Sequence, residues 1–172
     1  MIRKADLLFL TFLRHNARET LTTISRKTNI PISTLYDKLR QHENNVILKH
    51  TTLVDFAKLG YNCRAEIMLS LPKDDRDKIR VFLKGYPMIN SLFKINNGYD
   101  FLAEGVFENA KELEDFVEML EGKFQISDKK VFYVIEDIKR EEFLSEPGML
   151  SQLAQMKYVE KPLNNQKYSY QD

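Results

Sequence analysis

The fold is decided by residues 20–40, which read T-L-T-T-I-S-R-K-T-N-I-P-I-S-T-L-Y-D-K-L-R. Thr20 is a residue type that caps helices, and the stretch after it has one shared helical face, formed by Leu21, Ile24 and Thr28. Asn29 tolerates the left-handed backbone conformation that closes a helix, and Pro31 follows it before the next helical pattern. The stretch therefore predicts two short helices joined by a tight turn.

The second of these helices has two contrasting faces. Leu35 and Leu39 lie four residues apart, so both should face a core, while Ser33 and Thr34 are candidates for the helix cap. The outward side then holds hydroxyls, a phenol ring and charges: Ser33, Thr34, Tyr36, Asp37, Lys38 and Arg40. Such side chains can contact base edges and phosphates when a helix enters the major groove of DNA. An ordinary amphipathic helix with a solvated polar face is the open alternative.

The flanking segments extend this pair of helices into a larger domain. Residues 6–16 predict a packing helix whose buried side includes Phe9, Leu10 and Leu13. Residues 46–54 are rich in β-branched side chains and predict a short hairpin, or wing, with Lys49 and His50 near its tip for phosphate contact. Residues 1–60 are therefore predicted to form a winged helix-turn-helix domain.

Charge is unevenly distributed along the chain. Residues 1–60 hold ten Lys and Arg against five Asp and Glu, a net charge of +5, whereas residues 61–172 have a net charge of −4. A basic segment joined to an acidic one indicates that the first meets a polyanion, and double-stranded DNA is the expected partner. Composition alone leaves open a chance imbalance of a few charges.

Composition also indicates the cellular setting. No apolar run approaches the ~20 residues needed to span a bilayer, and the first residues lack the small-residue cleavage site of a signal peptide. Cys63 is the only cysteine, so neither an intrachain disulfide nor a thiolate metal cluster is expected. We expect a cytoplasmic protein that does not associate with a membrane.

Strand and helix signals alternate over residues 61–143. They follow the order β-α-β-β-α-β: strand 63–71, helix 74–85, strands 88–95 and 101–107, helix 111–120, and a strand within 125–138. This order is ferredoxin-like, so the whole chain is predicted to be an α+β protein with a winged helix-turn-helix followed by a βαββαβ domain. Residues 144–172 form a C-terminal extension, with a short helix predicted at 149–156 and a polar, mobile end at 164–172.

The predicted sheet indicates self-assembly. Both helices of a βαββαβ unit lie on one face of its sheet, which leaves the other face as a large exposed patch unless a second copy covers it. Two sheets packed face to face form a two-fold dimer, which presents two recognition helices to half-sites about one DNA turn apart. A homodimer is therefore expected, and a higher oligomer such as an octamer is left open.

Taken in order, these segments resemble the Lrp/AsnC (leucine-responsive, or feast/famine) transcriptional regulators over residues 3–143. The family's opening D-x-x-I-L-x-x-L and later Arg are matched by Asp6, Phe9, Leu10, Leu13 and Arg18. Its second and third helices are matched by Ile24, Ser25, Thr28, Asn29, Ile30, Pro31, Ser33, Thr34, Leu35, Lys38 and Leu39. Its wing and exit are matched by Asn45, Val46, Ile47, His50, Thr52, Val54, Asp55, Phe56, Leu59 and Gly60. The resemblance implies a sequence-specific DNA-binding regulator that dimerises and responds to an amino acid or related small molecule.

Departures from the family's pattern lie at the end of the third helix. His42 stands where the family has Leu, Asn45 stands where it has Gly, and the stretch before Val46 is one residue short. We therefore expect the recognition helix to end early or to turn differently into the wing.

The four residues Asn97, Gly98, Tyr99 and Asp100 form an Asn-Gly turn between two predicted strands. The corresponding turn of the family reads G-D/E-Y-D, near the pocket where an amino acid can bind between subunits, and Tyr99 and Asp100 match it. The resemblance implies that these four residues bind an effector, because an Asp can receive an α-ammonium and backbone amides an α-carboxylate. A turn that only joins the two strands is the open alternative.

No motif in the sequence supports catalysis. The sequence has no phosphate-cradling loop, no nucleophile elbow and no pair of metal ligands. Its histidines do not stand at the spacing of paired metal ligands: His15, His42 and His50. We expect no catalytic residue, no metal and no cofactor. Two alternatives are left open: an enzyme resembling the sirohaem decarboxylases, whose fold is similar, and an architectural DNA-binding protein without an effector.

Overall fold

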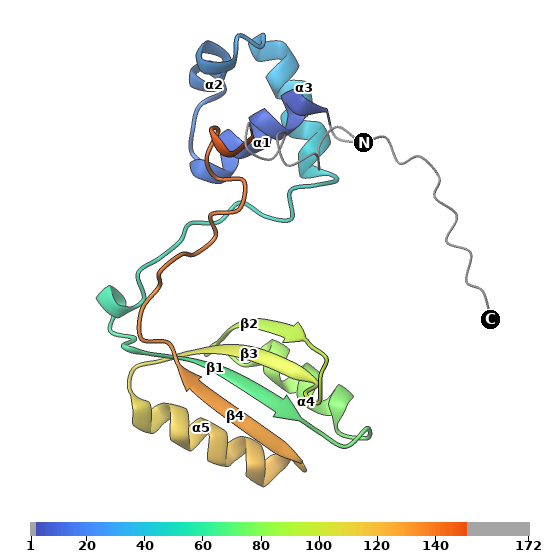
Figure 1. The fold of residues 1–172 in the computed structure, drawn as a ribbon, viewed down its shortest axis with the longest axis vertical. Helices are drawn as coiled ribbons and strands as arrows, with labels where there is room; N and C mark the ends of the chain where they lie inside the picture. The colour runs from blue at the N-terminus through green and yellow to red at the C-terminus, as the bar shows by residue number, and fades with distance from the viewer. Residues whose placement is uncertain (1–2, 151–172) are drawn as a thin grey trace, which may run out of the picture. The chain divides into compact units, whose positions relative to one another are not determined.

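The computed structural model describes residues 3–150, which form two compact units. Residues 3–52 and 139–150 make up the first unit, and residues 53–138 make up the second (Figure 1). In the described part of the chain, no helix is both long and apolar enough to cross a membrane.

The division differs from the one expected from sequence. The first expected boundary, at residue 60, falls inside the second unit, and residues 139–143, expected in the second domain, belong to the first unit. Most of the helix predicted at 149–156 and all of the polar end predicted at 164–172 lie outside the described residues.

Residues 3–52 of the first unit contain three helices: α1 (Lys4–His15), α2 (Leu21–Thr28) and α3 (Ile32–Glu43) (Figure 1). Thr20 caps α2, because its side-chain oxygen accepts a hydrogen bond from the Thr23 amide at 3.1 Å. Asn29 closes α2 in the left-handed conformation, with a φ of 56°, and Ser25 Oγ donates to the Ile30 carbonyl oxygen at 2.6 Å across the turn. The predicted helix-turn-helix is confirmed in its helices and in its turn.

The core of the first unit is small and apolar. Four side chains are buried at its centre: Phe9, Leu13, Ile24 and Leu35. Leu39 and Ile47 are partly buried and pack against these four residues. The inward face of α3 is therefore the one that Leu35 and Leu39 predict.

The start of α3 differs from the expectation. Its N-cap is Pro31, whose backbone is extended with φ −55° and ψ 141°, and the helix begins at the next residue. Because the pyrrolidine ring restricts φ and the helix starts directly after it, Ser33 and Thr34 lie within the first turn instead of capping it. No side chain of residues 3–150 caps this helix end.

The wing predicted at residues 46–54 is absent, because the described structure has no strand there. Instead, the amides of Asn45, Val46 and Ile47 all donate to the His42 carbonyl oxygen, at 3.1, 2.8 and 2.8 Å, and so close the end of α3. Residues 47–55 then form no regular element and pair with no strand of the described structure. Among the two outcomes expected from the family departures, α3 turns differently and does not end early.

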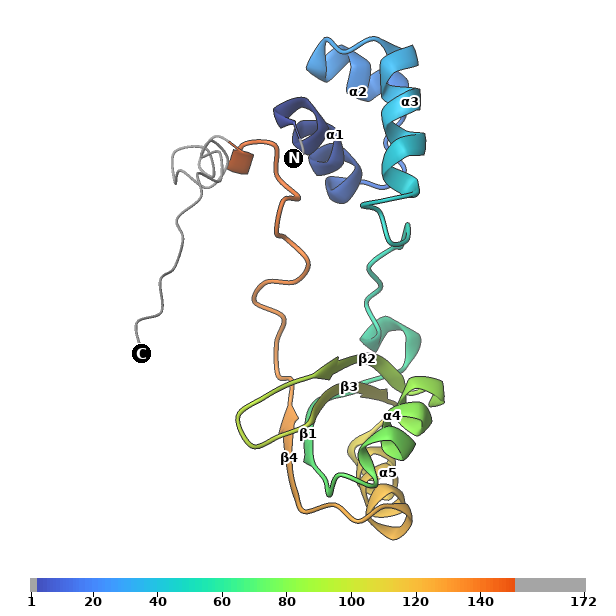
Figure 2. The same cartoon turned by 90° about the vertical axis from the view of Figure 1, so that its right-hand side faces the viewer.

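The second unit contains a four-stranded antiparallel sheet with the strand order β2-β3-β1-β4. A short 3-10 helix at Ala57–Leu59 precedes the sheet and its helices: β1 (Cys63–Ser70), α4 (Arg76–Gly85), β2 (Ile89–Lys94), β3 (Phe101–Phe107), α5 (Ala110–Lys123) and β4 (Asp128–Tyr133). Both helices lie on one side of the sheet (Figure 2). The predicted ferredoxin-like βαββαβ order is confirmed.

The sheet has a covered face and an uncovered face. The buried residues of β1 alternate along the strand and lie in the core with the helices: Cys63, Ala65, Ile67 and Leu69. Strand register places two rows on the opposite face, one of Ser91, Glu104, Glu66 and Phe132, the other of Phe93, Leu102, Met68 and Lys130. Neither α4 nor α5 covers these rows, and Phe93 and Phe132 are 54% and 53% exposed.

Candidate nucleic-acid interface

The outer face of α3 carries a continuous polar stripe. Four exposed residues at helical spacing share the side opposite the buried Leu35: Ser33, Asp37, Arg40 and Asn44. Thr34 and Tyr36 are also exposed and flank the stripe. Hydroxyl, amide, carboxylate and guanidinium groups are thus presented together on one surface, as base-edge recognition requires.

Two members of this surface were missed in the sequence. Asn44 ends α3, and its Nδ2 donates to the Arg40 carbonyl oxygen at 2.9 Å. Ile32, in the first turn, is 46% exposed and offers an apolar contact of the kind made with a thymine methyl group. The four-residue interval from Arg40 to Asn44 was the available signal, and it was overlooked because the helix was expected to end near His42.

Lys38 lies on the inner side of α3 and not on the outer face that the sequence predicted. Its Nζ donates a hydrogen bond to Asp6 Oδ1 of α1, and its side chain is only 17% exposed. Burial alone would raise the pKa of Asp6, but the hydrogen bond and charge of Lys38, followed by the hydrogen bond from the Arg3 amide, place the pKa below its ordinary value. Lys38 therefore joins α3 to α1, because a carboxylate 32 residues away in sequence holds its ammonium group.

Lys49 and His50 are exposed, but they do not stand at a hairpin tip. His50 Nε2 lies 3.1 Å from Glu43 Oε1 at the end of α3. Lys49 makes no ion pair within residues 3–150, and neither does the exposed Arg26 in the last turn of α2. Both cations are open to phosphate contact, and Arg26 was missed in the sequence because it lies outside the predicted recognition helix and wing.

The turn at residues 97–100 has the geometry that Asn-Gly favours, with φ of 66° at Asn97 and 90° at Gly98. Tyr99 donates its hydroxyl to Asp128 Oδ2 at 2.6 Å. Asp100 is engaged through both carboxylate oxygens, since Oδ2 accepts from the Leu71 amide and Oδ1 lies 2.8 Å from Arg76 Nε. The carboxylate expected to receive an ammonium group thus already has partners within the fold.

Metal-ligating side chains do not cluster in the described part of the chain. Residues 3–150 contain no group of three or more His, Cys, Asp or Glu side chains arranged to hold a metal ion.

Comparison with known proteins gives relatives in sequence, although no family model matches the chain. The chain is 26% identical over 116 residues to the HTH-type transcriptional regulator FL11 of Pyrococcus horikoshii, which covers 67% of this chain and 77% of that protein. It is 22% identical over 154 residues to the glutamate uptake regulatory protein of Zymomonas mobilis, which covers 86% of this chain and 94% of that protein.

Solved structures share the fold. A transcriptional regulator from Neisseria meningitidis in complex with L-Met matches with a TM-score of 0.76 and 22% identity, over 81% of this chain and 94% of that one. An AsnC family transcriptional regulator from Agrobacterium tumefaciens matches with a TM-score of 0.73 and 15% identity, over the same shares of the two chains. The relatives in sequence and the shared fold together confirm the resemblance of this chain to the Lrp/AsnC family of transcriptional regulators.

Proposed function

We propose that this chain is a transcriptional regulator of the cytoplasm that binds double-stranded DNA by placing α3 in the major groove. The polar stripe of α3 carries this proposal, because its side chains are exposed while Leu35 and His42 on the opposite side are buried. Arg40 at the middle of the stripe can bind guanine through two hydrogen bonds, and Asn44 can bind adenine in the same manner.

Groups around α3 support contacts with the phosphates of the DNA backbone. Because no side chain in the described part of the chain caps its N-terminus, the first backbone N–H groups are available to a phosphate oxygen. The exposed Arg26 and Lys49 add positive charge, and residues 1–60 have a net charge of +5. Such contacts position a protein on DNA without reading its sequence.

A homodimer formed through the sheet completes the proposed regulator. The uncovered face holds exposed aromatic rings at Phe93 and Phe132 beside the half-buried Met68 and Leu102. A face of this kind is stabilised when a second copy covers it, and two-fold packing would present two copies of α3 to two half-sites.

An amino-acid effector is the finer part of the proposal. The Neisseria relative in structure holds L-Met. In this chain, Arg76 and Asp100 form an ion pair beside the turn at 97–100, and the Arg76 side chain is 49% exposed. A free amino acid carries the same two charges, so its carboxylate can bind Arg76 while its ammonium binds Asp100. The engaged state of Asp100 favours the second candidate, an effector-independent DNA-binding protein.

The test of DNA binding is a mobility-shift titration of full-length protein on genomic fragments selected for binding. We expect affinity to fall steeply with salt, because each phosphate contact releases counterions. Arg40→Ala should weaken binding by about 1–3 kcal/mol through a lost base contact. Arg80→Ala removes the same charge from an exposed position of α4 and should leave affinity unchanged. Absence of retardation at low salt would contradict the proposal.

The test of the effector is a melting experiment with glycine, with the other standard amino acids in their L-form, and with the D-enantiomers of these. Ligand binding to the folded state raises the melting temperature by mass action. We expect one or a few L-amino acids to do so, and Arg76→Ala to remove the shift. If no amino acid changes the melting temperature or the DNA affinity, the effector-independent candidate is the correct one.

A further inference from the structure

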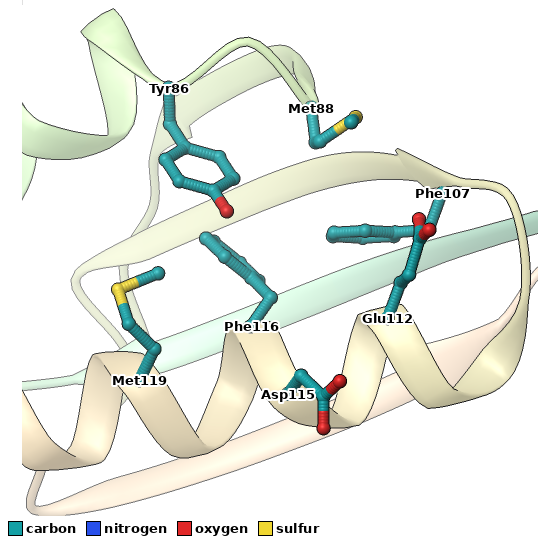
Figure 3. A pocket seen from close by; sticks show the side chains of 7 residues that line it. All are labelled: Tyr86, Met88, Phe107, Glu112, Asp115, Phe116 and Met119. Atoms are coloured by element: carbon teal, nitrogen blue, oxygen red, sulfur yellow. The ribbon is translucent and has the colours of Figure 1, made fainter.

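A second concave site lies on the helix side of the second unit, away from the turn at 97–100. It has a volume of about 320 Å³, near the lower end for pockets that bind small molecules. Side chains from the α4–β2 connection, from the end of β3 and from α5 line it: Tyr86, Met88, Phe107, Glu112, Asp115, Phe116 and Met119 (Figure 3).

The interior of this pocket is aromatic and thioether-rich. Tyr86 packs on Phe116 with ring centroids 4.6 Å apart, and Phe107 packs on the same ring at 5.4 Å. The side chains of Met88 and Met119 also line the pocket (Figure 3). Ring faces attract cations through their quadrupole, and methionine side chains adapt to an apolar ligand body.

The charge of the lining has one sign. Glu112 and Asp115 lie three residues apart on α5, and the lining residues that the structure describes include no Lys, Arg or His. Asp115 makes no hydrogen bond or ion pair within residues 3–150, whereas Glu112 Oε2 accepts only the Glu108 amide, at 3.1 Å. Two carboxylates without a cationic partner at an aromatic pocket favour a ligand that brings its own positive charge.

Among the described lining residues, a ligand carboxylate finds no cationic side chain. At the N-terminus of α5, the Glu112 amide is already used, because it donates to Asn109 Oδ1 at 3.1 Å, and the Glu108 amide before the helix donates to Glu112 Oε2. A free amino acid would therefore place its carboxylate against Glu112 and Asp115. An amine that lacks a carboxylate avoids this repulsion.

We infer that this pocket binds a small organic amine, with its apolar body against Tyr86, Phe107 and Phe116 and its ammonium at Asp115 and Glu112. The site is separate from the proposed amino-acid site, since none of residues 97–100 lines it. The amine pocket therefore does not depend on the amino-acid site proposed at the turn, and it would be present in the effector-independent candidate as well.

The test compares three probes that share a phenyl ring and a short chain: 2-phenylethylamine, L-phenylalanine and 3-phenylpropionate. Saturation-transfer NMR and calorimetric titration on full-length, DNA-free protein measure binding independently of the proposed regulatory function. We expect the amine to bind and the acid not to bind. L-Phenylalanine is measured on the Arg76→Ala variant, which lacks the proposed turn site. We expect its affinity for this variant to be at least tenfold lower than that of the amine.

Matched variants locate the binding. Asp115→Asn should weaken the amine about tenfold, as expected for the loss of one charge-assisted hydrogen bond. Glu118→Gln removes the same charge from an exposed position of α5 outside the lining and should leave amine affinity within twofold of wild type. The inference is overturned if the amine does not bind, if the acid binds equally well, or if both variants weaken the amine alike. A change in sedimentation mass with Asp115→Asn would also overturn it, because the pocket would then hold a second copy.

Discussion

His42 is buried against Asp6 in the first unit, at the position where the resembled family has Leu. Its Nε2 lies 3.6 Å from Asp6 Oδ1, longer than an ordinary hydrogen bond, and within residues 3–150 neither ring nitrogen has a partner at hydrogen-bonding distance. A buried polar group without a partner costs free energy that an apolar side chain of similar size does not.

The substitution His42→Leu is therefore expected to stabilise the protein by about 1 kcal/mol. Urea unfolding, followed by circular dichroism at neutral pH, measures the change. A lower free energy of unfolding in the variant would contradict this account, because the contact of His42 with Asp6 would then stabilise the fold. Gln41→Leu, an exposed neighbour on α3, is the control and should change stability little.

Asp6 gives the same region a pH dependence. Burial opposes its ionisation, but the hydrogen bond and charge of Lys38 lower its pKa below the ordinary value of 3.8. A lowered folded-state pKa contributes stability that is present above the unfolded-state value and is lost as pH falls through the folded one. Between about pH 6 and pH 3, wild type should therefore lose more stability than Asp6→Asn in urea unfolding. Equal losses in the two proteins would count against the ion pair with Lys38.

Lys38 also shows where prediction at the residue scale ends. Helical spacing sorted Leu35 from Ser33, Asp37 and Arg40 correctly, because those residues lie near the centres of the two faces. Lys38 lies near the border between the faces, and the side it takes depends on a carboxylate 32 residues earlier in the chain. Spacing within one helix contains no information about that carboxylate.

At the scale of elements, α3 has two leucines of unequal value to the core. Leu35 is fully buried, whereas Leu39 is partly buried at the edge. Leu35→Ala should cost about 2–5 kcal/mol of unfolding free energy through lost packing and a residual cavity. Leu39→Ala should cost less, because part of that side chain is already in water. Urea unfolding of the two variants checks the order, and a larger loss for Leu39→Ala would reverse the assignment.

The segment after α3 shows how an element can be mispredicted. The β-branched residues at 46–54 predicted a hairpin from local preference, but a hairpin also needs a partner strand. In the structure, the Val46 and Ile47 amides donate to the His42 carbonyl oxygen, and Ile47 packs onto the core.

The second unit was predicted well because its alternation, helical spacing and Asn97-Gly98 turn agree with one another.

The pairing of strands in the second unit also produced contacts that the sequence did not indicate. The register β1–β3 brings Glu66 opposite Glu104 on the uncovered face. Burial, together with the charge of Glu104, raises the pKa of Glu66, and Asn90 and Ser91 hold Glu104 by hydrogen bonds at 2.6 and 2.8 Å. Such a polar row between apolar side chains is consistent with an interface that a specific partner surface must match.

At the scale of the whole molecule, the uncovered sheet face predicts the oligomeric state. Sedimentation at micromolar concentration should give at least a dimer. Phe132→Asp should shift it towards monomer, because it would place a charge within an interface that must exclude water. The variant should still fold, since Phe132 is already 53% exposed within one chain.

Val81→Asp is the matched control, because Val81 is 69% exposed on α4 and lies on the helix side of the sheet. It should leave both mass and DNA affinity unchanged. Phe132→Asp should also weaken binding to paired half-sites, because a monomer presents a single α3 and loses the added affinity of two linked contacts. If Phe132→Asp remains dimeric while Val81→Asp becomes monomeric, the interface lies on the helix side of the sheet. Wild-type protein that sediments as a monomer would remove the dimer, and with it the paired half-sites.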